Sequence, residues 1–332
     1  MSAGDPAVLR VNDIHKTFER GKTRKDVLKG LSFTIESGQV LALLGANGAG
    51  KTTLINIVST LLLPTSGSAS VCGHDVVNEP RAVRELISLT GQFAAVDQEL
   101  TGRENLIFFS RLRGMSKKRS RERSNELLET FRLQDAADQR VGQYSGGMRR
   151  RLDIAASLVV EPRLLFLDEP TTGLDPLSRR ELWTTVEDLR DRGVTVLLTT
   201  QYLDEAERLA DNIVLIRDGR TVVQGTAANL REQFGAPICQ LSLDSVDDVQ
   251  RAREHLLPRI TGLDARSVTV EGLTVSFTTS RGADDLTDAL ELLRGHNVTV
   301  HSASLNAPSL DDVFMGLAFD SQAPAIDSEE AK

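Results

Sequence analysis

The 332-residue sequence lacks the features that mark secreted, membrane-spanning and metal-binding proteins. Its two cysteines, Cys72 and Cys239, are far apart and have no metal-ligand spacing, which favours a reduced cytosolic protein. No run approaches the roughly 18 apolar residues that a membrane helix requires. Residues 1–11 have no basic stretch followed by an apolar core, so we expect no secretory signal. If the protein acts at a membrane, another chain must supply the spanning helices.

The sequence also has fewer basic than acidic residues. The 39 Lys and Arg residues against 47 Asp and Glu residues give a formal net charge of −8, which argues against a nucleic-acid scaffold. The exception is a basic run from Arg111 to Arg123. We interpret it as a solvated helix face, with contact to a membrane surface or to nucleic acid as the alternatives.

The chain divides near residue 225. Residues 1–225 alternate apolar, strand-like runs with helical patterns, which favours strands buried on both faces of a sheet. Residues 95–160, approximately, are helical in period and rich in charge, which predicts a helical subdomain inserted between strands. Asp218-Gly219 predicts a hairpin turn.

The C-terminal part has a different element order. Residues 226–319 have the order β-α-β-β-α-β, which predicts a small α+β domain and suggests a ferredoxin-like sandwich. The tail at 320–332 is expected to be disordered.

The segment "GANGAGKTT", from Gly45 to Thr53, matches the phosphate-loop pattern G-x-x-x-x-G-K-[ST]. An apolar strand-like run precedes it and a helical pattern follows it, as the motif requires. Glycines allow backbone N–H groups to surround phosphate oxygens, and the helix N-terminus adds a favourable dipole. Lys51 is predicted to reach the β- and γ-phosphates, and the Thr52 hydroxyl to hold Mg²⁺.

An acidic pair follows a second buried run, "LLFLDEP". Because ligands of α/β sheets bind at strand ends, Asp168 is predicted to join a Mg²⁺ shell through water, and Glu169 to act as a general base. Without the phosphate loop, the pair would be an ordinary strand end.

A second glycine pair lies in "YSGGM". Ser145, Gly146 and Gly147 precede a helical pattern, so they form another helix N-terminus that could face an anion. A plain capped helix is the alternative.

Together, these segments resemble the ATP-binding subunit of ABC transporters. By that resemblance, residues 45–52 are the Walker A motif, 144–148 the signature and 164–170 the Walker B motif, while Gln92 is in the Q-loop and Asp175 in the D-loop. The implied fold is α/β: an ABC-type P-loop ATPase domain with a mixed sheet core and an inserted helical subdomain, followed by a small α+β domain.

The resemblance also implies the ligands and their contacts. ATP and Mg²⁺ are the expected cofactors, and the metal is expected at Thr52, Gln92 and Asp168, partly through water. The nucleotide contacts expected within the chain are Gly45, Asn47, Gly48, Gly50, Lys51, Thr52, Thr53, Gln92, Asp168 and Phe18. Phe18 is the only local candidate for stacking on adenine, with a core phenylalanine as the alternative.

The family explains the second helix end. Two copies pack head to tail, so that Ser145, Gly146, Gly147 and Asp175 would contact ATP held by the partner copy. ATP then joins the two copies, and its hydrolysis releases them. The catalytic residues implied are Glu169 and Gln201.

Gln201 departs from the family pattern, in which a histidine usually senses the γ-phosphate. A glutamine amide can still donate a hydrogen bond to phosphate, but it cannot become cationic. We expect altered hydrolysis and retained binding. An ordinary polar residue at a strand end is the alternative.

The segments "TTQYLDEAERLAD" and "SLDDVF" resemble the daunorubicin-resistance type of ATP-binding subunit. That resemblance implies an ATPase at the cytoplasmic face of the membrane, bound to an integral membrane permease and exporting a drug or an amphipathic lipid. Because both halves of the composite site are present in this chain, a homodimer is sufficient, with a heterodimer of ATPase subunits as the alternative, and no nucleic-acid partner is expected. Two alternatives remain: a soluble ABC ATPase that acts on ribosomes or nucleic acid, and a regulatory protein whose C-terminal domain binds a ligand. In the transporter, that domain could support the dimer.

Overall fold

The computed structural model describes residues 7–21, 23–91, 95–253, 268–311 and 313. The chain forms two compact units, residues 1–226 and 227–332, and each is described by itself. Gln92 and the tail at 320–332 lie outside the described residues.

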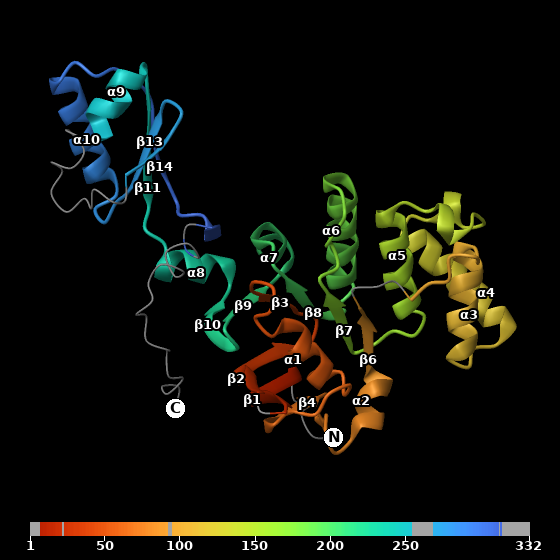
Figure 1. The fold of residues 1–332 in the computed structure, drawn as a ribbon. Helices are drawn as coiled ribbons and strands as arrows, with labels where there is room; N and C mark the ends of the chain where they lie inside the picture. Colours follow the sequence, from red (N-terminus) through yellow and green to blue (C-terminus); the bar gives the residue numbers. More distant parts are fainter. Residues whose placement is uncertain (1–6, 22, 92–94, 254–267, 312, 314–332) are drawn as a thin grey trace. The chain divides into compact units, whose positions relative to one another are not determined.

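The first unit contains a six-stranded mixed sheet (Figure 1). Four of its pairings between neighbouring strands are parallel, and the pairing of β9 with β10, at the other edge of the sheet from β6, is antiparallel. The strand order is β10 (Arg220–Gly225), β9 (Asn212–Arg217), β3 (Val40–Leu44), β8 (Thr195–Thr200), β7 (Leu164–Asp168) and β6 (Ile87–Thr90). Every residue of β3, β7 and β8 is buried, as expected for strands covered on both faces.

The hairpin between β9 and β10 turns at the predicted dipeptide. Asp218 and Gly219 have φ of 51° and 79°, the left-handed conformation that a tight hairpin turn needs. A Cβ on Gly219 would lie 2.2 Å from the Val27 carbonyl oxygen, so close packing also requires glycine.

A second sheet of four antiparallel strands completes the core of this unit. Its order is β2 (Thr23–Glu36), β1 (Ala7–Arg20), β4 (Ser66–Val71) and β5 (His74–Asp75). Helix α1 (Lys51–Val58) contributes Leu54, Ile55 and Ile57 to the apolar cluster shared with β1 and β3. Further helices of the unit are α2 (Pro80–Leu86), α6 (Pro176–Asp191) and α7 (Leu203–Leu209).

A helical part lies beside the β6 edge of the larger sheet (Figure 1). It consists of α3 (Gly102–Leu112), α4 (Lys117–Thr130) and α5 (Gly146–Ser157), with two short 3₁₀ turns, η1 (Gln134–Ala136) and η2 (Val141–Gln143), between α4 and α5. Thr101 and Glu104 form a capping box at the start of α3, and Ser116 caps α4. The basic run from Arg111 to Arg123 is largely exposed, and two of its arginines, Arg119 and Arg123, pair with carboxylates, as in the solvated face expected from the sequence.

The second unit begins with α8 (Ala227–Phe234) and contains a four-stranded antiparallel sheet. The chain order is β11 (Ile238–Leu243), α9 (Val246–Arg251), β12 (Thr269–Glu271), β13 (Thr274–Thr278), α10 (Ala283–Gly295) and β14 (Val300–Asn306). The sheet order is β12-β13-β11-β14, and α9 and α10 lie on one side of it (Figure 1). Leu241, Phe277 and Leu293 are in its separate core. An α/β unit followed by a small α+β unit confirms the predicted fold class.

No helix among the described residues is both long enough and apolar enough to cross a membrane.

Candidate active site

The phosphate loop, residues 45–50, connects β3 to α1. Gly48 and Gly50 have φ of 83° and 110°, in the region that favours glycine. A Cβ on Gly50 would lie 2.6 Å from the Leu28 Cδ2 atom, so packing also restricts this position. The Gly45 N–H donates to the Thr200 carbonyl (3.2 Å), which fixes the start of the loop against β8.

Lys51 is the first residue of α1 and is only 4% exposed. Its Nζ donates to the carbonyls of Gly45 (2.8 Å) and Ala46 (3.2 Å), and it lies 3.1 Å from the Glu169 Oε1 atom. A buried ammonium needs such partners, because desolvation strongly penalises an unpaired charge. The chain therefore holds a buried positive charge beside its phosphate loop.

Asp168 is the last residue of β7 and is 4% exposed. Its Oδ1 accepts a 2.6 Å hydrogen bond from the Thr199 hydroxyl and lies 3.5 Å from the Thr52 hydroxyl. Thr199 is on β8, directly opposite Asp168 in the parallel register. The two predicted magnesium groups, Thr52 and Asp168, are thus brought together.

Glu169 has φ of 46°, which is a strained conformation for a residue other than glycine. Its N–H donates to the Thr199 hydroxyl (2.9 Å), and its Oε2 accepts from the Thr172 hydroxyl (3.4 Å). Its carboxylate lies beside Lys51, although Asp168, one residue earlier, points toward Thr199 and Thr52. The separate directions of the two carboxylates are what different chemical roles require.

A hollow of 760 Å³ lies over this group of residues. It is lined by Phe18, Lys25, Val27, Asn47, Gly48, Gly50, Lys51, Thr52, Thr53, Glu169 and Thr172. Phe18, on β1, is 42% exposed, and the Lys16 ammonium lies 5.1 Å from its ring centroid. Phe18 is therefore not a core residue, and it lies where a flat ring could stack.

Gln201 directly follows β8, the strand between β3 and β7. Thr200 pairs with Leu44, the residue before the phosphate loop, and Thr199 pairs with Asp168. Gln201 is half-buried at the same sheet edge as Gly45 and Glu169. The structure thus places it near the predicted phosphate site, although it is not among the described residues that line the hollow.

The helix end at residues 145–147 borders a second hollow of 360 Å³, which Gly146 lines together with Glu169 and Thr172. Ser145 caps α5 by accepting from the Met148 N–H (3.1 Å), and both Ser145 and Gly146 are exposed. A Cβ on Gly147 would lie 2.5 Å from the Ser178 Oγ atom, so Gly147 allows α5 to pack on α6. None of the three is among the described residues that line the hollow around Lys51.

Asp175 caps α6 by accepting from the N–H groups of Leu177 (3.1 Å) and Ser178 (3.0 Å). A further hydrogen bond from the Ser178 hydroxyl (2.7 Å) holds the pKa of the Asp175 carboxyl below its usual value. The carboxylate is therefore committed to the helix end that packs on Gly147.

Three residues at this edge were not identified from the sequence: Thr199, Thr172 and Arg150. Thr199 was visible as a hydroxyl in an apolar run, but strand pairing was needed to place it against Asp168. Arg150 is 8% exposed on α5, and it contacts the backbone around Glu169. The motif spacing carried no signal for that contact.

Comparison with known proteins identifies the family. A family model described as "ABC transporter" matches residues 28–172. The doxorubicin resistance ATP-binding protein DrrA of Mycobacterium tuberculosis is 43% identical over 323 residues, which cover 96% of each chain. The chain belongs to the ATP-binding subunits of ABC transporters, in the daunorubicin/doxorubicin-resistance group. This ABC subunit is also 49% identical to a Streptomyces peucetius relative named daunorubicin/doxorubicin resistance ATP-binding protein DrrA, over 87% of this chain and 86% of the relative.

A solved dimeric ATP-binding cassette, in a post-hydrolysis state with ADP and Pi, matches with a TM-score of 0.59 and 25% identity. The match covers 66% of this chain and 98% of the cassette. The ABC subunit is therefore an ATP-binding ATPase, as the motifs predicted, and the comparisons do not favour the soluble ribosome- or nucleic-acid-acting alternative.

Proposed function

We propose that two copies of this ABC subunit bind two ATP molecules between them and drive export through a separate integral membrane subunit. The observation that carries the proposal is the division of phosphate-binding groups within one chain. Lys51 and Glu169 line one hollow, whereas exposed Gly146 lines a neighbouring hollow that shares Glu169 but not Lys51. A head-to-tail pair of copies would bring the helix end of one to the hollow of the other. The dimeric cassette that this chain resembles supports that arrangement.

The contacts of Lys51 suggest an order of events. In this structure, Lys51 directs its ammonium to two loop carbonyls and to Glu169. A phosphate in the loop would compete with Glu169 for that ammonium, since both are anions. Glu169 would then be free to accept a proton from an attacking water, while Gln201 donates a hydrogen bond at the same sheet edge.

The residues fit Mg²⁺ as the metal. Among the described residues, no group of three or more His, Cys, Asp or Glu side chains is arranged to hold a metal. Thr52 and Asp168 instead offer one hydroxyl and one carboxylate oxygen, 3.5 Å apart. Hard oxygen ligands supplemented by phosphate and water suit Mg²⁺, which would neutralise charge on the phosphate oxygens. Gln92 remains a proposed third ligand outside the described residues.

A groove of 310 Å³ provides a surface for the membrane subunit. It lies between β6, α3 and α5, and it is lined by Leu89, Gly91, Ala95, Phe109 and Leu112 among others. The side chains of Phe108 and Leu112 on α3 are 51% and 66% exposed. Exposed apolar groups beside a groove are typical of a protein-binding surface, and the Q-loop residues begin at Gly91.

The exported compound is proposed from relatives alone. Two similar proteins carry doxorubicin-resistance names, so a drug or an amphipathic lipid or natural product is the proposed class. We place the subunit at the cytoplasmic face of the membrane, held there by its permease. The α+β unit is proposed to support the dimer.

A pull-down tests this proposal. Tagged Glu169→Gln protein, incubated with ATP and Mg²⁺, is recovered from detergent-solubilised native membranes, and retained chains are identified by mass spectrometry. We expect a polytopic membrane protein, because the variant should bind ATP and remain dimeric. Light scattering of the purified variant should show an ATP-dependent dimer.

Lys51→Ala protein is the matched control, because it should not form the ATP-bound dimer. Recovery of the same membrane protein only with Glu169→Gln and ATP supports coupling of the nucleotide state to the permease complex. Recovery of ribosomes or nucleic acid without a membrane chain would refute the export proposal.

A further inference from the structure

Arg150 contacts the backbone on both sides of Glu169. Its Nη2 donates to the Asp168 carbonyl (3.2 Å), and its Nε donates to the Pro170 carbonyl (3.0 Å). The guanidinium is buried on α5, five residues after the Ser145 cap. One side chain from the signature helix therefore holds the two carbonyls that flank the proposed base.

Glu169 needs such support because its backbone is strained. A non-glycine residue with φ of 46° persists only where the surrounding contacts determine its conformation. Thr199 holds the Glu169 N–H, and Arg150 holds the carbonyls before and after it. These two residues thus hold the Glu169 backbone from which the carboxylate extends toward Lys51.

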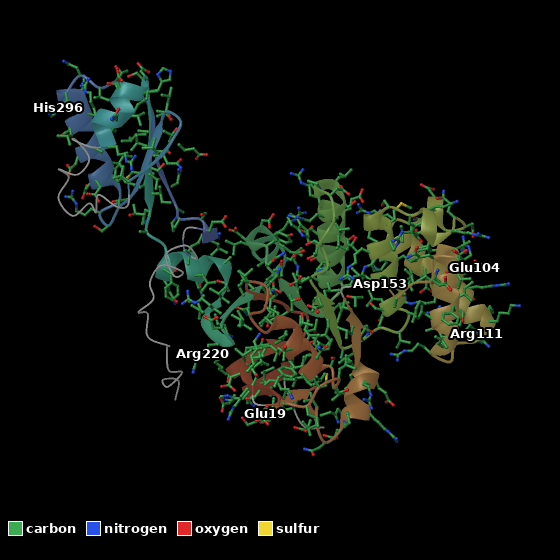
Figure 2. The ribbon with its side chains drawn as sticks, viewed as in Figure 1. Glu19, Glu104, Arg111, Asp153, Arg220 and His296 are labelled. Carbon is green, nitrogen blue, oxygen red and sulfur yellow. The ribbon has the colours of Figure 1, made fainter. Side chains whose placement is uncertain are left out.

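The same guanidinium also reaches the Q-loop. Its Nη1 donates to the Gly91 carbonyl (2.6 Å) and lies 3.3 Å from the Asp153 Oδ2 atom. Asp153 is 4% exposed, and its Oδ1 accepts from the Ala95 N–H (2.7 Å). In Figure 2, Asp153 lies inward of Glu104 and Arg111, which are at the outer side of the helical part. Residues 91 and 95, at the two ends of the segment that contains Gln92, are therefore both bound to this pair.

Burial makes the two charges depend on one another. It raises the pKa of the Asp153 carboxyl and lowers the pKa of the Arg150 guanidinium, whereas each partner's charge opposes the other's shift. Removing either charge would leave the other buried without its partner, which is strongly unfavourable. The pair therefore behaves as one unit.

We infer that Arg150 is a positioning residue for Glu169, and that the Arg150–Asp153 pair links the Q-loop end of the docking groove to ATP hydrolysis. The groove is lined by Gly91, Ala95 and Asp153, so a bound helix of the membrane subunit would lie against the atoms that the pair holds. A displacement of Gly91 or Ala95 would move the Arg150–Asp153 pair and, through Arg150, the Glu169 backbone. The inference rests on the proposed role of Glu169 as the base.

Arg150→Lys is the first test. A lysine keeps the charge, but its single ammonium cannot span three carbonyls as a planar guanidinium does. We expect kcat for ATP hydrolysis to fall by about 100-fold, because a small misplacement of a catalytic group has that order of effect. The dissociation constant for MgATP should change by less than about twofold, because Lys51 and the phosphate loop are untouched.

Arg123→Lys is the matched control. Arg123 also donates hydrogen bonds to two carbonyls, of Leu158 (2.9 Å) and Val159 (3.2 Å), and to the Glu126 carboxylate. It belongs to α4 and does not contact the backbone around Glu169. We expect its kcat to remain near that of the unsubstituted protein. An equal fall in kcat for both variants would overturn the positioning role in favour of a general loss of structure.

A double-variant cycle separates this inference from the function on which it rests. In a Glu169→Gln background, Arg150→Lys should cost no further hydrolysis, because the group that it positions has been removed. Additive losses would overturn the inference. If Glu169→Gln alone hydrolyses ATP at full rate, the base assignment fails instead.

Asp153→Asn provides a second measurement if Arg150→Lys does not fold. The amide oxygen can still accept from the Ala95 N–H, but the negative charge beside Arg150 is lost. We expect a fall in kcat of about 10-fold without a matching change in MgATP affinity. An unchanged kcat would show that Gly91 and Ala95 are not linked to Glu169 through this pair.

Discussion

At the sheet edge, Lys51, Asp168 and Glu169 all have partners within the chain, whereas the helix end at Ser145 and Gly146 is exposed. The first region is largely buried, and its hydrogen-bond partners include the carbonyls of the phosphate loop and the Thr199 hydroxyl on β8. The second offers backbone N–H groups at a helix N-terminus. Within one chain, Lys51 and Glu169 are thus already paired, whereas the helix end at Ser145 and Gly146 is exposed and available to a partner copy in the proposed dimer. Variants of each region should consequently fail in different ways.

Glu169→Gln should produce the largest effect. The substitution keeps the size of the side chain but removes the proton acceptor, so kcat should fall by about 1000-fold. MgATP binding should be retained, because an amide can still lie beside Lys51. Steady-state hydrolysis and equilibrium nucleotide binding measure the two quantities.

The control for that variant is Glu161→Gln, which changes a carboxylate whose side chain is 80% exposed and outside the hollow. It should leave hydrolysis unchanged. Rapid turnover by Glu169→Gln would refute the assignment of Glu169 as the base.

Lys51→Ala should instead abolish tight nucleotide binding. It removes the buried ammonium and leaves Glu169 without its 3.1 Å partner. We expect MgATP affinity to fall by about 100-fold or more, since a charge-assisted contact to phosphate is lost. Isothermal titration calorimetry measures the affinity.

Lys25→Ala removes a positive charge from the same hollow, but from an exposed side chain. A screened surface charge should matter little, with an expected change of less than about threefold. If both lysine variants lost affinity equally, general charge rather than the buried contact would explain nucleotide binding.

Gly147→Ala and Gly146→Ala test the buried and the exposed glycine of the helix end separately. A Cβ at Gly147 would lie 2.5 Å from Ser178 Oγ, whereas one at Gly146 would lie 3.5 Å from Leu174 Cδ2. Overpacking at Gly147 should lower the free energy of unfolding by about 1–3 kcal/mol. Gly146→Ala should change it by less than about 0.5 kcal/mol. Denaturant unfolding of both variants measures the difference.

The order of the two variants should reverse when dimer formation is measured in place of stability, because Gly146→Ala, which hardly changes stability, should weaken the dimer. Gly146→Ala should fold but weaken the ATP-dependent dimer of the Glu169→Gln protein, because Gly146 is the exposed member of the pair. A normal dimer with Gly146→Ala would show that the helix end does not contact the partner's nucleotide.

These contrasts also show how far the sequence could be interpreted. The buried strands β3, β7 and β8 were predictable because uninterrupted apolar runs have few other structures available. The phosphate loop was predictable because its chemistry depends on local spacing. The fold class and the ABC family followed from such local signals and were confirmed.

The contacts around Glu169 were not predictable in this way. Thr199 lies 31 positions from Asp168, and Arg150 lies 18 positions from it, so their contacts depend on strand pairing and on the packing of α5. The positive φ of Glu169 likewise has no signal in its residue type. The motif predicted Gly147 as an anion contact, but it gave no signal that a Cβ there would lie 2.5 Å from Ser178 Oγ on α6. Local motifs predict which groups are present, whereas tertiary contacts decide how each is held.

Gln201→His should have the smallest effect and the most specific one. The side chain lies at the shared sheet edge after β8, so an imidazole there can also donate to phosphate. At high pH we expect kcat within about threefold of the unsubstituted protein, because a neutral imidazole and an amide each offer a donor. A histidine with a pKa of about 6.5 becomes cationic as the pH falls, and a phosphate neighbour favours that charged form. The ratio of variant to unsubstituted kcat should therefore rise as the pH falls from 8 to 6.

Gln224→His, at an exposed position on β10, is the control and should show a constant ratio. A constant ratio for Gln201→His as well would mean that residue 201 does not contact the phosphate, and that its amide is an ordinary polar group at a strand end.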